Sequence, residues 1–166
     1  MSAAPLATPA GFETLDACHQ QILQHLILLT ALAQHIETVG VDDQAQLQAA
    51  AVEAFFSGTS RQHHLEEEKS VFPPLLASGN TELVALVRVV QQDHGWIEEN
   101  WLELAPQLRA MASGNAWVDG AEFQHNAEVF LTLCRSHIEL EEKMIYPQAK
   151  AFRERSVANR LSRVPL

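Results

Sequence analysis

The sequence has few cysteines, few basic residues and no long apolar run, and each shortage excludes a class of protein. Its 166 residues include two cysteines, which are too few for a disulfide framework and match no zinc motif. It has 11 Lys and Arg against 21 Asp and Glu, for a formal net charge of −10. Such a surface repels phosphate backbones and anionic lipids, and no stretch approaches the ~18 apolar residues of a membrane span. We therefore expect neither nucleic acid nor a membrane as a partner.

The features of a secretory signal are missing as well. The start, MSAAPLATPAGF, has neither the positive segment nor the apolar core of a signal peptide. We therefore expect a cytoplasmic location. The length corresponds to about one domain, and 47% apolar with 19% charged residues is typical of a globular protein.

Alternating β-branched segments are also absent, whereas apolar residues recur at steps of three and four almost throughout. This period is that of an amphipathic α-helix. Breaks at residues 40–44, 77–80 and 113–120 divide the chain into four helical blocks. Because short connections between long helices favour antiparallel neighbours, the sequence predicts an all-α, up-down-up-down four-helix bundle over residues 12–152.

The prolines and the two ends of the chain fall outside this regular pattern. Pro73, Pro106 and Pro147 lie inside helical patterns. We expect them to kink or end their helices, because proline lacks a backbone donor and clashes with the preceding turn. Residues 1–11 form a predicted flexible arm, and residues 153–166 form a predicted tail that is loose or packs outside the bundle.

The seam of each helical block is interrupted by one histidine, and in the second and fourth blocks a glutamate follows it four residues later. These six residues are His19, His63, Glu67, His94, His137 and Glu141. Residues equally far from a connecting loop lie at the same height in antiparallel helices. By this count the histidines agree to within one or two residues, or about 3 Å at a rise of ~1.5 Å per residue. We therefore expect all six side chains in one layer of the core.

The second block contains two adjacent histidines, and only one of them can lie on the seam. His63 continues the seam positions of that block, and His64 continues a polar series that is expected to face solvent. The two series are Val52, Phe56, Thr59, His63 and Glu53, Ser57, Ser60, His64. The pattern H-x-x-x-E-E-K-x-x-[FY]-P, which begins at His63, begins again at His137. The repeat therefore favours His63 over His64 as the ligand.

Histidine and glutamate in one buried layer indicate metal binding. A single histidine on an apolar seam is more often a core residue with a hydrogen-bond partner. Buried carboxylates, however, are costly unless they are paired or bind a metal. Imidazole and carboxylate are ligands of iron, manganese and zinc, and spacing at i and i+4 puts both groups on one helix face. The pattern therefore predicts a metal site.

These segments resemble the hemerythrin-like, or HHE cation-binding, domain family. The resemblance is carried by LDACHQQIL, HHLEEEKSVFP, QQDHGWIEENW and HIELEEKMIYP, and it spans about residues 12–150. It implies a non-haem di-iron centre with an oxo or hydroxo bridge, in which Glu67 and Glu141 bridge the irons and the histidines are terminal ligands. Zinc or manganese could substitute for iron. Ferritin-like bundles differ, because they carry lone glutamates and Glu-x-x-His pairs.

The chain departs from the oxygen-carrying hemerythrins on the third helix. They have H-x-x-x-H there, whereas this chain has His94 followed by Glu98. A count of twelve coordination positions for two irons leaves two unassigned. One must stay open for a small ligand, and the other could be filled by His64, Glu98 or water. His64 adjoins a seam ligand, and Glu98 has the better i+4 geometry relative to His94.

Three further residues adjoin the expected ligands. Glu68 and Glu142 either point outward or hydrogen-bond a ligand histidine. Cys134 lies one turn before His137, where it could line a pocket or simply fill space as a small apolar side chain.

The resemblance implies a protein that binds O2, or a related ligand such as NO or peroxide, for storage, delivery or sensing. One alternative is an enzyme with the same ligands: a di-iron oxidase, a ferroxidase or a peroxide-consuming protein. Another is a helical interaction bundle whose site holds zinc or is empty.

Overall fold

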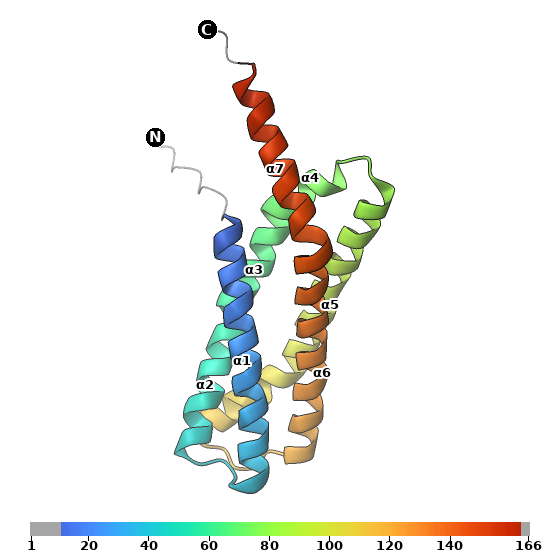
Figure 1. The fold of residues 1–166 in the computed structure, drawn as a ribbon. Helices are drawn as coiled ribbons and strands as arrows, with labels where there is room; N and C mark the ends of the chain where they lie inside the picture. The colour runs from blue at the N-terminus through green and yellow to red at the C-terminus, as the bar shows by residue number, and fades with distance from the viewer. Residues whose placement is uncertain (1–10, 164–166) are drawn as a thin grey trace, which may run out of the picture.

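The computed structural model describes residues 11–163, which are almost entirely helical (Figure 1). The predicted arm, apart from Gly11, and the last three residues lie outside the described residues. In chain order the segments are α1 Phe12–Thr38, α2 Asp43–Ser57, α3 Thr59–Glu66, η1 Glu67–Val71, α4 Phe72–Leu76, α5 Thr81–Ala112, α6 Gly120–Leu140, η2 Glu141–Ile145 and α7 Tyr146–Leu161. The segments η1 and η2 are π-helical.

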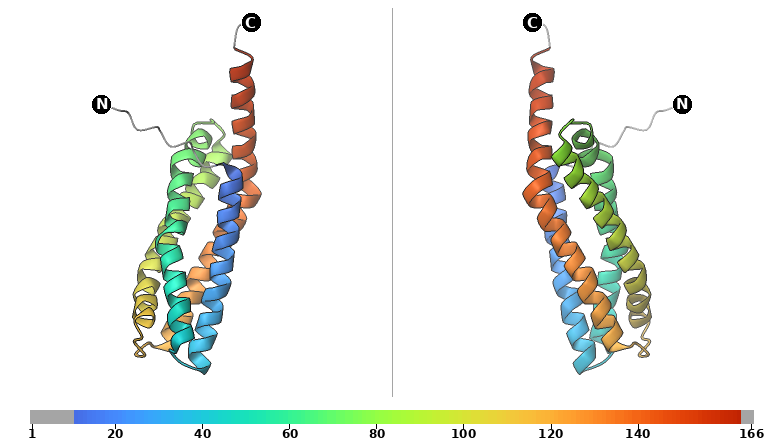
Figure 2. Two further views of the ribbon diagram at one scale, coloured as in Figure 1. Left: turned by 90° about the vertical axis from the view of Figure 1, so that its left-hand side faces the viewer. Right: turned by 90° about the vertical axis from the view of Figure 1, so that its right-hand side faces the viewer.

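Four helical rods pack as a bundle, which confirms the predicted fold class (Figures 1 and 2). The first rod is α1 and the third is α5, while the second runs from α2 to α4 and the fourth from α6 to α7. Helices α1 and α5 each contact both α2 and α6, so the rods surround one interior. Successive rods run in opposite directions, as short connections require.

Short polar turns end one rod and begin the next. The side chains that accept a hydrogen bond from a backbone N–H in the first turn of the following helix are Asp42, Asn80 and Asp119. Each cap satisfies a donor that the helix itself leaves unpaired. Each of the three turns also contains one glycine with positive φ, a conformation in which a Cβ atom is unfavourable.

The apolar interior consists of two clusters. The larger one contains Leu26, Phe56, Trp101, Phe123 and Phe130 among its members. The smaller one lies toward the other end of the bundle, where α4, α7 and the beginnings of α1 and α5 meet. On every rod the predicted metal ligands lie between residues of the larger cluster and residues of the smaller one. The layer of histidines and glutamates therefore has apolar packing on both sides.

The three prolines do not end their rods. Pro73 and Pro147 each occupy the first turn of a helix that directly follows a π-helical segment; the first turn tolerates proline because its N–H groups have no partner within the helix. Helix α5 continues for six residues beyond Pro106, so this proline does not end its helix. Pro106 and Leu102, four residues earlier, are both exposed. Water can therefore reach the carbonyl that proline leaves unpaired.

Helix α7 extends past the rest of the bundle (Figures 1 and 2). The predicted tail is thus helical as far as Leu161, and it is exposed from Glu154 onward. Within residues 11–163, none of the helices combines the length and the apolar character needed to cross a membrane.

Candidate metal centre

A break at Gly58 precedes the two adjacent histidines of the second rod. Helix α2 ends at Ser57 and α3 begins at Thr59, and Gly58 between them has φ −113° and ψ −87°. At this point the seam passes through Ser60, which is buried, rather than Thr59, which is exposed, and it continues to His63 and Glu67 as predicted. His64 is nevertheless partly buried, and its ring stacks on His94 of α5, so the solvent-facing position expected for it is wrong.

The six predicted residues meet in one layer together with His64. Their helices bring the side chains into two groups of potential ligand atoms, each lying within 4.8 Å of one another. The three-histidine group is His64, Glu67, His94 and His137, and the two-histidine group is His19, His63, Glu67 and Glu141. The His64 ring stacks on His94, with centroids 4.2 Å apart. Apart from His94 and His64, which are partly buried, all members are buried.

Glu67 belongs to both groups and offers one oxygen to each. Its Oε1 lies 3.1 Å from His63 Nε2 and 3.8 Å from His19 Nε2. Its Oε2 lies 3.2 Å from His94 Nε2, on the other side. The π-helical segment η1 begins at this residue, and π-helical turns are frequent at functional sites.

Glu141, where η2 begins, repeats this arrangement in the second half of the bundle. Its Oε1 lies 3.1 Å from His137 Nε2 and 3.7 Å from His94 Nε2. Its Oε2 lies 3.1 Å from His19 Nε2. Each of the two carboxylates therefore faces both groups, as a bridging ligand would.

Two carboxylates form hydrogen bonds with the Nδ1 atoms of two histidines, on the side of each ring that faces away from the layer. Glu142 Oε1 lies 3.1 Å from His19 Nδ1, and Glu68 Oε1 lies 2.8 Å from His94 Nδ1. These contacts place a hydrogen on Nδ1, because an ionised carboxylate can only accept. When the ring is neutral, as a metal ligand must be, its lone pair is on Nε2, which points into the layer.

Asp93 is a third carboxylate of this kind, and the sequence did not reveal it. Its Oδ2 lies 3.5 Å from His137 Nδ1, which is longer than a good hydrogen bond. Glu68 and Glu142 stand in repeated motifs, whereas Asp93 merely precedes His94. Only the packing of α5 against α6 brings it to His137.

Several buried atoms of the layer have no hydrogen-bond partner. Among the described residues seven buried side-chain N or O atoms are unpaired, and five of them belong to these groups. The five are both ring nitrogens of His63, Glu67 Oε2, His137 Nδ1 and Glu141 Oε1. Some lie about 3.1 Å from a neighbour, but in directions unsuitable for hydrogen bonds. The inward-facing atoms among them are His63 Nε2, Glu67 Oε2 and Glu141 Oε1, and a shared cation would satisfy them.

Protonated histidines balance the negative charges of the two buried glutamates in the layer. Burial lowers the pKa of His19 and of His94, but Glu141 and Glu67 outweigh burial and raise each pKa to about 10. Burial and the charge of Glu67 act to raise the pKa of Glu141, yet His137 and His19 lower it to about 2. Two buried carboxylates thus stay ionised only because cations surround them. Metal dications fit the same role.

His64 differs from the other histidines in its charge. Burial holds the pKa of His64 well below its usual value, and the neighbouring His94 lowers it further. The ring is therefore neutral and keeps a lone pair available. Neutral imidazole is the form that ligates metals, so His64 fits the three-histidine group chemically as well as by position.

Tyr146 is a site residue that sequence reasoning missed. Its hydroxyl donates to Glu67 Oε1 and lies 3.2 Å from His19 Nε2. Its ring is buried and stacks on His19. Burial and the charge of Glu67 raise the pKa of Tyr146, so the phenol stays protonated and donates. The signal in the sequence was the aromatic position of the repeated motif, where Phe72 is the counterpart.

Two other predicted residues lie outside both groups. Glu98 forms a bidentate ion pair with Arg61 at a half-exposed position, because the face of α5 that carries it turns toward α3 rather than the layer. Cys134 is buried in the larger apolar cluster, and burial raises the pKa of its thiol. Neither residue contributes to the groups of potential ligands.

A groove of about 580 Å³ between α1 and α3 borders His63 of the two-histidine group. Its lining includes His63, Cys18, Thr14 and Gln62. Burial, together with the charge of Glu67, raises the pKa of the Cys18 thiol to about 11, so the sulfur is neutral. The groove wall beside His63 therefore carries no thiolate charge.

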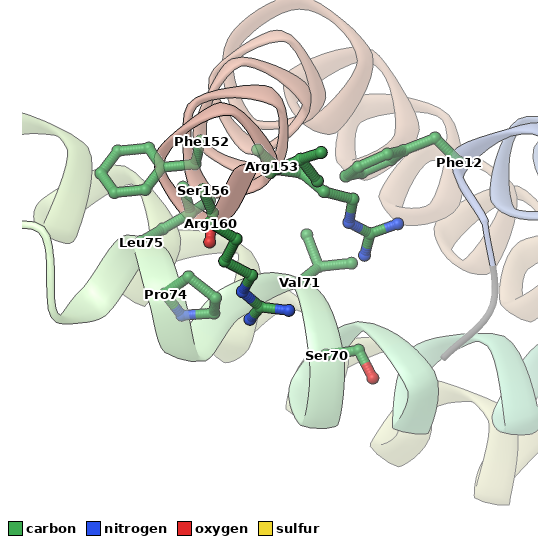
Figure 3. A pocket seen from close by; sticks show the side chains of 11 residues that line it. Phe12, Ser70, Val71, Pro74, Leu75, Phe152, Arg153, Ser156 and Arg160 are labelled. Carbon is green, nitrogen blue, oxygen red and sulfur yellow. The ribbon is translucent and has the colours of Figure 1, made fainter. Parts of the chain in front are cut away.

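A separate cavity of about 470 Å³ lies where α7 passes α4 and the start of α1 (Figure 3). Its walls are mainly apolar, and Arg153 and Arg160 reach across it. The Arg153 guanidinium stacks 4.4 Å from the centroid of the Phe12 ring. Its lining includes no member of the two histidine groups, so this cavity is distinct from the candidate metal centre.

The fold and the layer together define a helical cation-binding domain. Residues 10–149 match the hemerythrin HHE cation binding domain, and the chain belongs to that family. A search of curated proteins finds no match.

Proposed function

We propose that the chain holds two iron ions and binds O2, or a related small ligand such as NO or peroxide. The observation that carries the proposal is the position of Glu67 and Glu141, each with one oxygen toward either histidine group. Two carboxylates placed in this way can each bind two cations, one through each oxygen, whereas a single cation would use only one oxygen of each. Mixed imidazole and carboxylate donors favour iron, with manganese and zinc as competitors.

The two groups differ in the number of donors that they offer. The three-histidine group has His64, His94 and His137 with one oxygen from each glutamate, which makes five donor atoms. The two-histidine group has His19 and His63 with the remaining two oxygens, which makes four. We assign His64 to the unfilled position of the first group, and we exclude Glu98. The small ligand then belongs at the two-histidine group, beside the groove.

When bound, a pair of ferrous ions supplies an open coordination position and the electrons that a ligand such as O2 requires. The protein itself provides apolar residues on both sides of the layer. Phe72 and Tyr146 cover the layer on one side, and Ile97 and Ile138 belong to the apolar cluster on the other. These walls exclude water from the groups, which favours reversible binding over loss of the bound ligand by reaction.

Metal analysis combined with oxygen exposure tests the proposal. The purified chain should contain about two irons, as expected for a carboxylate-bridged pair. After anaerobic reduction, O2 should produce new near-ultraviolet or visible bands that reverse when O2 is removed. The absence of iron and of any such bands would refute the proposal. Turnover of an added substrate would favour the enzyme alternative, and zinc alone would favour an interaction bundle.

A matched pair of variants shows whether the signal comes from this layer. Glu67→Gln removes a bridging carboxylate and should abolish both the second iron and the O2-dependent bands. Glu139→Gln alters an exposed carboxylate that pairs with Lys143 and should change neither.

A further inference from the structure

The two halves of the candidate metal centre are near copies that differ at one hydroxyl group. Tyr146 and Phe72 each stand five residues after the glutamate of their motif. The Tyr146 ring stacks on His19 with centroids 5.0 Å apart, and the Phe72 ring stacks on His94 at 5.6 Å. The rings therefore occupy equivalent places, and the phenolic oxygen has no counterpart in the other half.

This hydroxyl changes the hydrogen bonding of only one carboxylate. Tyr146 donates to Glu67 Oε1, the oxygen that lies 3.1 Å from His63 Nε2. The equivalent oxygen in the other half is Glu141 Oε1, which lies 3.1 Å from His137 Nε2. Among the described residues it has no hydrogen-bond partner. One bridging oxygen thus shares its electrons with a proton donor, and its counterpart does not.

We propose that Tyr146 is a positioning residue that makes the two metal positions unequal by holding Glu67 Oε1 through its hydroxyl. The inference rests on the proposed function, because it concerns two bound cations. A carboxylate oxygen that accepts a strong hydrogen bond offers less electron density to a cation. A cation in the two-histidine group is therefore held less tightly and attracts an added small ligand more strongly.

The same hydroxyl matters before any cation binds. It satisfies an oxygen of a fully buried carboxylate, and a metal must compete with it for that oxygen. Both effects have the same sign, since each weakens cation binding at the two-histidine group. The three-histidine group has no such competitor, because Phe72 stands in the equivalent place.

Anaerobic calorimetric titration with Fe²⁺ alone tests this inference in four forms of the full chain: wild type, Tyr146→Phe, Phe72→Tyr and the double swap. We expect Tyr146→Phe to bind one of the two equivalents about tenfold more tightly, as loss of a hydrogen bond to a charged group implies. The other equivalent should stay within about twofold. Phe72→Tyr should weaken the opposite equivalent, and the double swap should exchange the two affinities.

The outcomes separate this inference from the proposed function. Two equivalents of iron with unchanged constants in Tyr146→Phe would overturn the inference alone, even if thermal unfolding of the metal-free variant shifted, because ring packing affects only folding. A wild-type chain that binds no Fe²⁺ would overturn both. Circular dichroism of each metal-free variant verifies that the bundle is intact, and Tyr to Phe preserves the ring that stacks on His19.

Discussion

Glu142 and His19 are separated by 123 residues, yet Glu142 Oε1 lies 3.1 Å from His19 Nδ1. The contact joins the fourth rod to the first and fixes the tautomer of a buried histidine. Carboxylates in this position typically contribute 10–100-fold to metal affinity. We therefore expect Glu142→Gln to weaken metal binding by about that factor, measured by competition with a chromophoric chelator. Glu154→Gln, on the exposed part of α7, should have no effect, and equal losses in both variants would contradict the prediction.

The adjacent histidines should respond differently to removal. His63→Ala leaves the two-histidine group with a single imidazole, so we expect about one iron per chain, since ligand number decides whether a cation is retained. His64→Ala should keep two irons with a lower affinity, because two imidazoles remain in its group. Iron content after dialysis measures both. The exposed His125 provides the control variant His125→Ala, and a full loss of iron in His64→Ala would show that the assignment of the groups is wrong.

Metal binding should stabilise the bundle, because the ligand residues of the two histidine groups come together only in the folded state. A ligand present at 100 times its dissociation constant adds about 2.7 kcal/mol to the free energy of unfolding. For a chain of this size that corresponds to roughly 5–10 °C in Tm. Differential scanning calorimetry with and without Zn²⁺ or anaerobic Fe²⁺ measures the shift. The variant Glu67→Gln/Glu141→Gln should show almost none.

A pH dependence follows from the cap of α2. Hydrogen bonds from the Ala45 N–H and from His35 lower the pKa of Asp42. A carboxylate whose pKa is lowered in the folded state stabilises the fold above its unfolded-state pKa, and this contribution is lost as the pH falls through the folded-state value. Asp42→Asn keeps the capping oxygen without the charge. Its free energy of unfolding, measured by urea denaturation between about pH 6 and about pH 3, should fall less than that of wild type.

Much of the arrangement could be predicted from the sequence, because period and distance from loops are properties of single helices. The four-helix bundle and the common height of His19, His63, His94 and His137 followed from counting along the chain. Loop centres need only be right to within a few residues for that argument, since each residue adds ~1.5 Å. Repetition of the motif then indicated Glu67 and Glu141.

The rest depends on how one rod faces another, which counting along a single helix does not reveal. His64 lies beside the seam position of His63, yet its ring stacks on His94 of the third rod. Asp93 and Tyr146 reach histidines on other rods, and no spacing in the sequence predicts those pairs. Glu98 has suitable spacing from His94 but faces Arg61. In each case packing between rods decided the outcome, and the period of one helix did not.

The two π-helical segments carry a consequence for sequence alignment. Each adds one residue to a helical turn between a glutamate and the aromatic ring that covers the layer. Deleting a single residue such as Ser70 would restore the α-helical period, in which four steps of about 100° turn the chain about as far as five wider π-helical steps, so Phe72 would keep its place near His94. A one-residue gap within Glu67–Val71 or Glu141–Ile145 would therefore keep the residues after it on the same sides of their rods, whereas a one-residue gap in an α-helical part of a rod would rotate them out of the layer.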